Sequence, residues 1–476
     1  MVALSRSGLV AALCCLSAEL RPFALGVSSG TGVFEPWLEE LWATEGRPGS
    51  VGGSGPGGAK PLELRIAKAL GSKGYNKVRI SVIGQEPQEF TDFNFTYNEQ
   101  FKYRWTENFL HSALVDLQPG ANKFSIGGQQ VVVDLPAEDE GIRGVLWSDP
   151  CFSSKYINCK YADRFQTFNH SIAMLNAAFA DQSMNMFSIL GDNFYDQTGE
   201  LSKTFFDRLS PEVKRRFMLI VSGNHDNWVC GGPNCGTKSD NFAIGQMQYY
   251  PSDTVASTLA PQSDSIFLDF SKDPDANGGQ YNSFQNVGTN FLVYHKLGNI
   301  GFLGFSGAAE FNDTLPHFKE ACQYFNESKP ATVFLLGHWN KDNDGARPGM
   351  SVPEVRTELL KLPECAFLGD RLKYMDGHQH CNFVHDKDAT GPFGFMIGAH
   401  GMDDDSCEAQ AGFLFMDSTK GRVRLHYFET ASESRGDRFE EILACVTSHG
   451  LAGCTQLADT WLDIPVAVQE STIEWV

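Results

Sequence analysis

Hydrophobic and polar residues alternate in several short runs between residues 61 and 139. Residues 77–83, 101–105 and 130–135 have the two-residue period of a strand that is buried on one face. Glycine and proline lie between the runs, where tight turns need them. We therefore expect residues 61–139 to form a small all-β, sandwich-like domain with an accessory role.

From residue 140 the pattern changes to strands that alternate with helices. Residues 144–147, 186–190 and 218–221 are almost continuously apolar, which predicts strands buried on both faces. Between the first two strands, residues 161–181 carry hydrophobic side chains at the spacing of a helix. This alternation predicts an α/β domain with helices packed on a sheet.

Later apolar runs extend this α/β domain over residues 140–432. Residues 331–336 and 371–375 are expected to be two more buried strands. Residues 412–417 and 422–428 look like an antiparallel pair, and we expect this pair to close a second sheet.

The ends of the chain differ from the rest in composition. Residues 1–26 combine Arg6 with a short apolar core and small residues after it, as a signal peptide does; a poorly ordered N-terminus is the alternative. Residues 27–60 form a Gly/Ser/Pro-rich linker, and residues 433–476 a C-terminal extension. We expect secretion, or delivery to an endomembrane or vacuolar lumen, without stable membrane insertion.

Length and charge limit the classes of partner. The 476 residues suffice for two domains, and 42% hydrophobic with 20% charged residues is ordinary globular composition. The formal net charge is −20 and no basic run is present, so we expect no nucleic-acid partner.

The cysteines fit an oxidising compartment. Outside the predicted signal peptide the chain has an even number, and three pairs lie close enough in sequence to close short loops: Cys151–Cys159, Cys230–Cys235 and Cys445–Cys454. The sequence does not fix the pairing of the remaining four, Cys322, Cys365, Cys381 and Cys407, and buried reduced thiols are the alternative. Sequons permissive for glycosylation stand at Asn94, Asn169, Asn312 and Asn326.

Five short polar segments each follow an apolar, strand-like run. They are Trp147-Ser148-Asp149, Gly191-Asp192-Asn193-Phe194-Tyr195, Gly223-Asn224-His225-Asp226, Gly337-His338 and Gly377-His378-Gln379-His380. The carboxyl ends of strands are where open α/β sheets place their sites. The segments supply seven donors for metal ions: Asp149, Asp192, Tyr195, Asn224, His338, His378 and His380.

This donor set suits two adjacent cations. Asp192 can bridge them through its two carboxylate oxygens, Asn224 offers a neutral carbonyl oxygen, and the histidines offer imidazole nitrogens. His378 and His380 reach different metals only if their loop curls, which Gly377 permits. Paired metal ions are a device for attacking phosphate esters with metal-bound hydroxide.

These motifs resemble the calcineurin-like metallophosphoesterase superfamily, and within it the purple acid phosphatases, over residues 145–430. The distinguishing motif is Gly-Asp-x-x-Tyr, which stands here as Gly191 to Tyr195. The resemblance implies a four-layer αββα sandwich. It also implies an Fe(III) site from Asp149, Asp192, Tyr195 and His380, and a divalent site for Fe, Zn or Mn from Asp192, Asn224, His338 and His378.

The resemblance further implies direct hydrolysis of phosphate monoesters, in small molecules or phosphoproteins. Asp192 and His225 are the expected catalytic residues, with His225 neutralising the phosphate and protonating the leaving alkoxide. His225, Asn224 and, less directly, His400 are the expected substrate-binding residues.

Two departures from the family pattern are present. Cys151 stands where other members of the superfamily have a metal-binding histidine, and it either forms a disulfide or acts as a ligand. The fourth motif reads Gly337-His338-Trp339-Asn340 where the family has Gly-His-x-Pro. A phosphodiesterase or nucleotide pyrophosphatase with the same metals, and a non-catalytic binding protein of the same fold, are the competing hypotheses.

Overall fold

The computed structural model describes most of the chain after the predicted linker. The described residues are 62–84, 90–93, 97–103, 106–155, 157–196, 199–226, 250, 252–255, 292–340 and 349–465. They belong to one compact unit, Pro61–Val476. The predicted signal peptide, the linker and the Cys230–Cys235 pair lie outside the described residues.

Two β-sheets dominate the described part of the chain. The larger has the strand order β18-β17-β16-β7-β8-β9-β1-β2-β4-β3, with β19 paired to β17. Its strands are β1 (Leu64–Lys68), β2 (Lys77–Gly84), β3 (Tyr97–Tyr103), β4 (Thr106–Asp116), β7 (Arg143–Trp147), β8 (Met186–Leu190), β9 (Phe217–Val221), β16 (Gln410–Thr419), β17 (Arg422–Ser432), β18 (Gly436–Asp437) and β19 (Asp459–Pro465). The strands β7, β8 and β9, which precede the first three polar segments, are parallel neighbours.

The smaller sheet has the order β10-β11-β12-β13-β15-β14. Its strands are β10 (Val293–Leu297), β11 (Ile300–Gly304), β12 (Thr332–Leu336), β13 (Leu372–Asp376), β14 (Asn382–Asp388) and β15 (Gly391–Ile397). The parallel neighbours β12 and β13 precede the last two polar segments. Each sheet therefore gathers its own polar segments at one edge.

The predicted second sheet has a different membership from the one expected. Residues 412–417 and 422–428 do form an antiparallel pair, within β16 and β17. They join the larger sheet, because β16 pairs with β7 through Leu414 and Leu146. The second sheet is built instead around residues 331–336 and 371–375, which lie in β12 and β13.

The strands expected between residues 61 and 139 are present. Four of them extend the larger sheet, because β1 pairs in parallel with β9 at Ile66 and Phe217. The other two, β5 (Gly120–Ile126) and β6 (Gln129–Leu135), form a separate antiparallel ribbon. The expected domain boundary near residue 139 therefore does not coincide with a break in the larger sheet.

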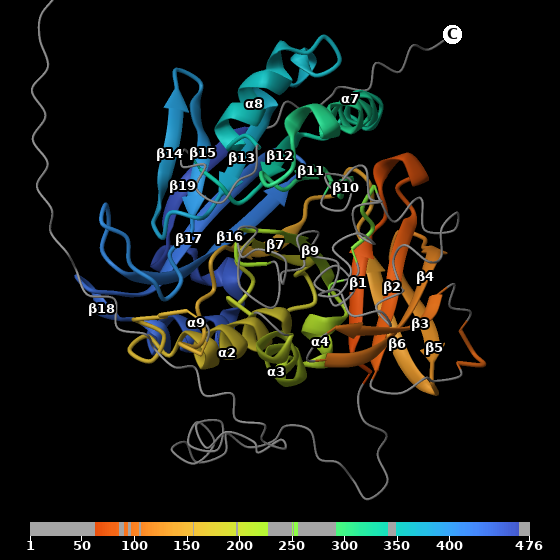
Figure 1. The fold of residues 1–476 in the computed structure, drawn as a ribbon, viewed down its shortest axis with the longest axis horizontal. Helices are drawn as coiled ribbons and strands as arrows, with labels where there is room; N and C mark the ends of the chain where they lie inside the picture. Colours follow the sequence, from red (N-terminus) through yellow and green to blue (C-terminus); the bar gives the residue numbers. More distant parts are fainter. Residues whose placement is uncertain are drawn as a thin grey trace, which may run out of the picture. The chain divides into compact units, whose positions relative to one another are not determined.

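Helices cover the outer face of each sheet, as Figure 1 shows for α7 and α8 beside one sheet and α2, α3 and α9 beside the other. Their bounds are α2 (Thr167–Phe179), α3 (Glu200–Arg208), α4 (Pro211–Lys214), α7 (Phe311–Ser328), α8 (Val352–Lys361) and α9 (Phe439–His449), with short 3₁₀ turns η1 (Gly71–Lys73), η7 (Ala366–Arg371) and η8 (Leu451–Leu457). The predicted four-layer αββα arrangement is confirmed.

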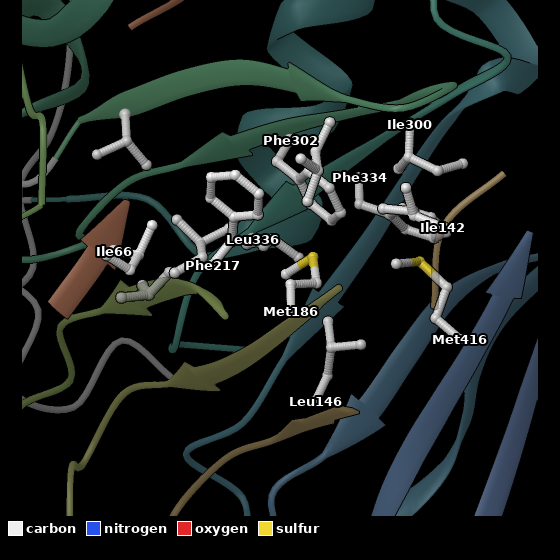
Figure 2. Packing of buried hydrophobic residues seen from close by; sticks show 14 of the residues in the cluster. Ile66, Ile142, Leu146, Met186, Phe217, Ile300, Phe302, Phe334, Leu336 and Met416 are labelled. Carbon is white, nitrogen blue, oxygen red and sulfur yellow. The ribbon is translucent and has the colours of Figure 1, made fainter. Parts of the chain in front are cut away.

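The apolar run in β12 shows why the layers form. Phe334 and Leu336 pack in the core between the two sheets (Figure 2), together with Met186 of the larger sheet. Val333 and Leu335 point the other way, into the core beneath α7 and α8. A strand with apolar neighbours on both faces needs this continuous hydrophobic sequence.

Disulfides and the C-terminal segment complete the unit. The pairs Cys151–Cys159 and Cys445–Cys454 form as expected, and the other four cysteines pair as Cys322–Cys365 and Cys381–Cys407. The extension expected from residue 433 packs on the larger sheet through α9 and β19, where Trp461 stacks on Tyr427. Within the described ranges, no helix has both the length and the apolar character to cross a membrane.

Candidate metal centre

The five polar segments meet where the two sheets end side by side. The amide of Asp149 donates to the Gly191 carbonyl at 3.2 Å, which joins the loops after β7 and β8. The amide of Gly377 donates to the His338 carbonyl at 2.9 Å, which joins the loops after β13 and β12. The His378 amide reaches across to Asp149 Oδ2 at 3.0 Å, linking the edges of the two sheets.

Tyr195 is the centre of one group of donors. Its hydroxyl donates to Asp149 Oδ1 at 3.1 Å and lies 2.9 Å from His380 Nε2. The Nδ1–H of His380 donates a hydrogen bond to the Asp403 carbonyl at 3.2 Å, so the Nε2 lone pair faces the phenol oxygen. His380 Nε2 is also 3.7 Å from Asp149 Oδ1.

His338 is the centre of a second group. Its Nδ1–H donates a hydrogen bond to the Leu190 carbonyl at 2.9 Å, which leaves the Nε2 lone pair facing the other ligand side chains. That nitrogen lies 3.2 Å from Asn224 Oδ1, 3.4 Å from Asp192 Oδ1 and 3.8 Å from Asp149 Oδ1.

His378 completes the second group, with its Nδ1 placed 3.0 Å from Asn224 Oδ1. His378 and His380 therefore reach different groups of donors. The loop between them curls as expected, with His378 at φ 68° after Gly377.

The facing atoms are mostly acceptors, and this is the test of whether the residues fit metal ions. Lone pairs of imidazole, carboxylate and amide groups converge only around a cation or an added proton. Neighbouring ligands of one cation, bonded at about 2.1 Å, stand roughly 3 Å apart, as the contacts around Tyr195 and Asn224 do. Donor atoms of Asp149, Asp192 and His338 all lie within 4.8 Å of one another. The donor set therefore fits adjacent cations.

Electrostatics lead to the same conclusion. Burial opposes the charging of His338, but the Asp192 and Asp149 carboxylates outweigh it and raise the pKa of His338 to about 10. Burial, with Asp149 and Asp192 beside it, raises the pKa of Tyr195 far above its usual range. His338 and Tyr195 therefore retain their protons near neutral pH, and bound cations would replace those protons.

Backbone conformation concentrates strain at the same place. Of the seven non-glycine residues with positive φ in the described chain, four are predicted ligands: Asp149, Asp192, Tyr195 and His378. Gly191 has φ +92°, and a Cβ there would lie 2.4 Å from His338 Nδ1. A Cβ on Gly223 would lie 2.2 Å from Asp192 Oδ1, so the loops can approach the ligands only as glycine.

The predicted ligands differ in their exposure to solvent, and we call the buried ones the floor of the centre and the partly exposed ones its rim. Asp149, Asp192, Tyr195 and His338 are buried, whereas Asn224, His225, His378 and His380 are partly exposed. The His225 amide donates to Asp192 Oδ1 at 2.9 Å, and its ring lies beside Tyr195 with centroids 5.0 Å apart. The structure thus brings all seven predicted ligands and His225 together.

Asp226 is a supporting residue that our sequence reasoning missed. Its carboxylate accepts the amide of Asn193 at 2.8 Å, the side-chain amide of Asn193 at 2.8 Å and the amide of Gly223 at 2.6 Å. It therefore ties the Asp192 loop to the Asn224 loop. Burial and the Asp192 charge raise the pKa of Asp226 to about 7. Its place in the Asn-His-Asp segment was the available signal.

His400 is not brought into this group. Its Nδ1–H is given to the Gly412 carbonyl at 2.8 Å, and its Nε2 accepts from the Ser171 hydroxyl at 2.7 Å. The ring is buried between α2 and the larger sheet, with both nitrogens used. This placement gives His400 a packing role and leaves it no atom for substrate.

His400 should make the fold sensitive to acid. Burial lowers the pKa of His400 to about 4, whereas an unfolded histidine titrates near 6.5. The unfolded state therefore binds the proton first, and stability is lost as pH falls from about 6.5 towards 4, by at most roughly 3 kcal/mol. His400→Gln is expected to flatten this loss in urea unfolding of chelator-treated protein at pH 7 and pH 4.5. The exposed His449→Gln is the control, and equal slopes for both variants would contradict the assignment.

Comparison with known proteins gives a distant likeness in fold. No protein-family model and no curated protein sequence matches the chain. Similar solved structures include the purple acid phosphatase PPD1 from yellow lupin (Lupinus luteus) seeds, at 12% identity over 79% of this chain and 72% of that one, with a TM-score of 0.43.

Two further likenesses are weaker by TM-score. PhoD has 11% identity over 80% of this chain and 88% of its own, with a TM-score of 0.41. Vacuolar Protein Sorting 29 from Cryptosporidium parvum has 14% identity over 61% and 92%, with a TM-score of 0.26. Likenesses at this level do not decide what the chain binds or catalyses.

Proposed function

We propose that this protein is a dimetal phosphoesterase that hydrolyses phosphate monoesters, with acid phosphatase character, in a secretory lumen or outside the cell. The observation that carries the proposal is the convergence of lone pairs from seven side chains, each on a loop that follows a strand. The disulfides of the described chain are consistent with the compartment.

The donors divide into two sets that share Asp192. Asp149, Tyr195 and His380 with Asp192 form the phenolate site, and a phenolate favours Fe(III). Asn224, His338 and His378 with Asp192 form the amide site, for divalent Fe, Zn or Mn. Such a metal pair supplies activated water and neutralises charge on a phosphate.

Neighbouring residues of the chain orient the ligand side chains. The Leu190 and Asp403 carbonyls fix the tautomers of His338 and His380, so that Nε2 of each points inward. Asp226 holds two ligand loops in register. The buried floor excludes bulk water from one side, and the partly exposed rim leaves access from the other.

His225 is the proposed proton donor. Its backbone is anchored to Asp192 while its ring stands at the rim beside Tyr195. From there the imidazole can hydrogen-bond a phosphate oxygen and protonate the leaving alkoxide. It needs no part in holding the cations.

His225→Ala should therefore lower kcat more for substrates with a poor leaving group than for substrates with a good one. An alkyl phosphate, whose alkoxide needs a proton, is expected to lose roughly 10²–10³ in kcat, and an activated aryl phosphate much less. Metal content should be unchanged. His317→Ala, on α7, is the matched control. An equal loss with both substrates would contradict the proton-donor role.

The reaction class is tested by comparing two substrates on metal-loaded protein. We expect an aryl phosphate to be turned over faster than a bis-aryl phosphate across acidic and neutral pH. Faster cleavage of the diester would replace the proposal with a phosphodiesterase. Absence of bound metal after native purification would favour a non-catalytic binding protein.

A further inference from the structure

Two of the disulfides in the described chain lie against the proposed phenolate site. Cys381 directly follows His380, and its partner Cys407 has its Sγ 3.3 Å from the His380 carbonyl oxygen. Cys151 lies two residues after Asp149, and the Cys151–Cys159 pair packs in one buried cluster with Tyr195. Each phenolate-site ligand outside the shared Asp192 therefore has a disulfide beside it.

The segment Asp403–Cys407, here called the bracing loop, supports His380 through several contacts. The Asp403 carbonyl accepts the His380 Nδ1–H at 3.2 Å and so determines which ring nitrogen points inward. Gln379, the residue before His380, donates its side-chain amide to Ser406 Oγ and to Asp404 Oδ1. Cys407 then closes the loop covalently onto Cys381.

An ion pair connects the two disulfide-linked regions. Lys160, next to Cys159, places its Nζ 2.6 Å from Asp403 Oδ2. Both side chains are exposed to solvent, so this pair alone contributes little to stability. Within the described residues, the Cys381–Cys407 disulfide is the one covalent restraint on the bracing loop, beside its hydrogen bonds to Gln379 and His380.

The amide site is held differently. His338 follows β12 after the single residue Gly337, its ring is fully buried, and its Nδ1 is fixed by the carbonyl that ends β8. In the described chain no disulfide involves a residue adjacent to Asn224 or His338. The third amide-site residue, His378, lies three residues before Cys381, but its amide is held by Asp149 Oδ2 and its ring lies against Asn224. The two sites thus differ in how much they depend on disulfides.

We propose that the Cys381–Cys407 disulfide positions His380 through the bracing loop, and that its cleavage by a dithiol weakens the phenolate site while sparing the amide site. The inference rests on the proposed function only in taking these side chains as metal ligands. It makes His380 dependent on the redox state of a disulfide that does not itself touch the reacting atoms.

The redox step is a thiol–disulfide exchange. A thiolate of the dithiol attacks Sγ of Cys407, which is partly exposed, while Cys381 is buried. The S–S bond breaks, Cys381 leaves as a thiolate, and Cys407 is held in a mixed disulfide. The second thiolate of the reagent then displaces Cys407 and closes a cyclic disulfide. The reagent is oxidised by two electrons, and both cysteines end as thiols after taking up protons.

Cys445–Cys454 provides a matched control. Its Cys445 is also partly exposed and its Cys454 is buried, but it links α9 to η8 away from the polar segments. A general effect of losing a half-exposed disulfide would therefore appear in both double-serine variants. An effect on His380 would appear only when Cys381 and Cys407 are replaced.

The test measures metal affinity by chelator competition and metal content by elemental analysis. Cys381→Ser/Cys407→Ser is expected to bind one of its metals about 10- to 100-fold more weakly and to keep the other. Cys445→Ser/Cys454→Ser should keep both. Wild-type affinity for both metals in the first variant would overturn the inference. Absence of metal from the wild type would instead overturn the proposed function.

A second measurement avoids reliance on the folding of a variant. Folded wild-type protein is treated with dithiothreitol, alkylated, mapped by peptide mass spectrometry, dialysed and then resupplied with metal. Loss of affinity at one site should follow alkylation of Cys407 and not that of Cys445. Full affinity for both metals with Cys407 alkylated would contradict the inference.

Discussion

Asp192→Asn is expected to lower kcat by at least about 10³-fold and to strip the protein of metal. Asparagine keeps the size of the side chain, and its Oδ1 can still accept the His225 amide, so the loop should retain its conformation. The charge that faces His338 Nε2 at 3.4 Å is lost, and one of the two carboxylate oxygens that would hold the cations becomes an amide nitrogen. Activity assays and elemental analysis of the same preparation measure both effects.

The control for this variant is Asp417→Asn. Asp417 pairs with Arg143 at 2.8 Å, at the opposite end of β7 from the predicted ligands. Asp417→Asn removes a carboxylate of the same type from the same sheet, and metal content and turnover should not change. Normal turnover in Asp192→Asn would show that Asp192 does not bridge cations.

Tyr195→Phe is expected to abolish a visible phenolate-to-iron absorption band and to lower activity about 10- to 100-fold. The phenylalanine ring can keep the packing of Tyr195 against the Cys151–Cys159 cluster, so the fold should persist. The hydroxyl is lost, and with it the contacts to Asp149 and His380. Because burial raises the pKa of Tyr195, only a strongly charged cation can keep the phenolate ionised near neutral pH.

Visible spectroscopy on wild type and variant measures this effect directly. If the wild-type protein contains only zinc and has no such band, the Fe(III) assignment is wrong, although a dimetal centre is still supported. A band that persists in Tyr195→Phe would assign the phenolate to another residue.

The local features of this fold could be predicted because they depend on short-range patterns. Apolar runs identified β7, β8, β9, β12 and β13, and the glycines after the last four of these strands marked the points where the chain turns toward the centre. Parallel strands bring their carboxyl ends to one edge. The closeness of Asp149 and Asp192 follows from that geometry, and the packing of the two sheets against each other adds His338.

Long-range pairings were not accessible in the same way. Whether β16 joins β7 or a second sheet depends on contacts such as Leu414 with Leu146, which the alternation of one strand does not encode. The partners of Cys322 and Cys381 are likewise set by the packing of distant segments. His400 follows a buried strand as the ligands do, and only the contacts with Ser171 and Gly412 distinguish it from them.

In the proposed centre, seven side chains from five loops hold a pair of adjacent cations. The most direct test is the metal stoichiometry of native protein, purified without chelators and compared with Asp192→Asn in the same elemental analysis. We predict two tightly bound metal ions per chain in the wild type and none retained in the variant. A wild-type protein that binds no metal when supplied with iron, zinc or manganese would show that these side chains form no metal centre.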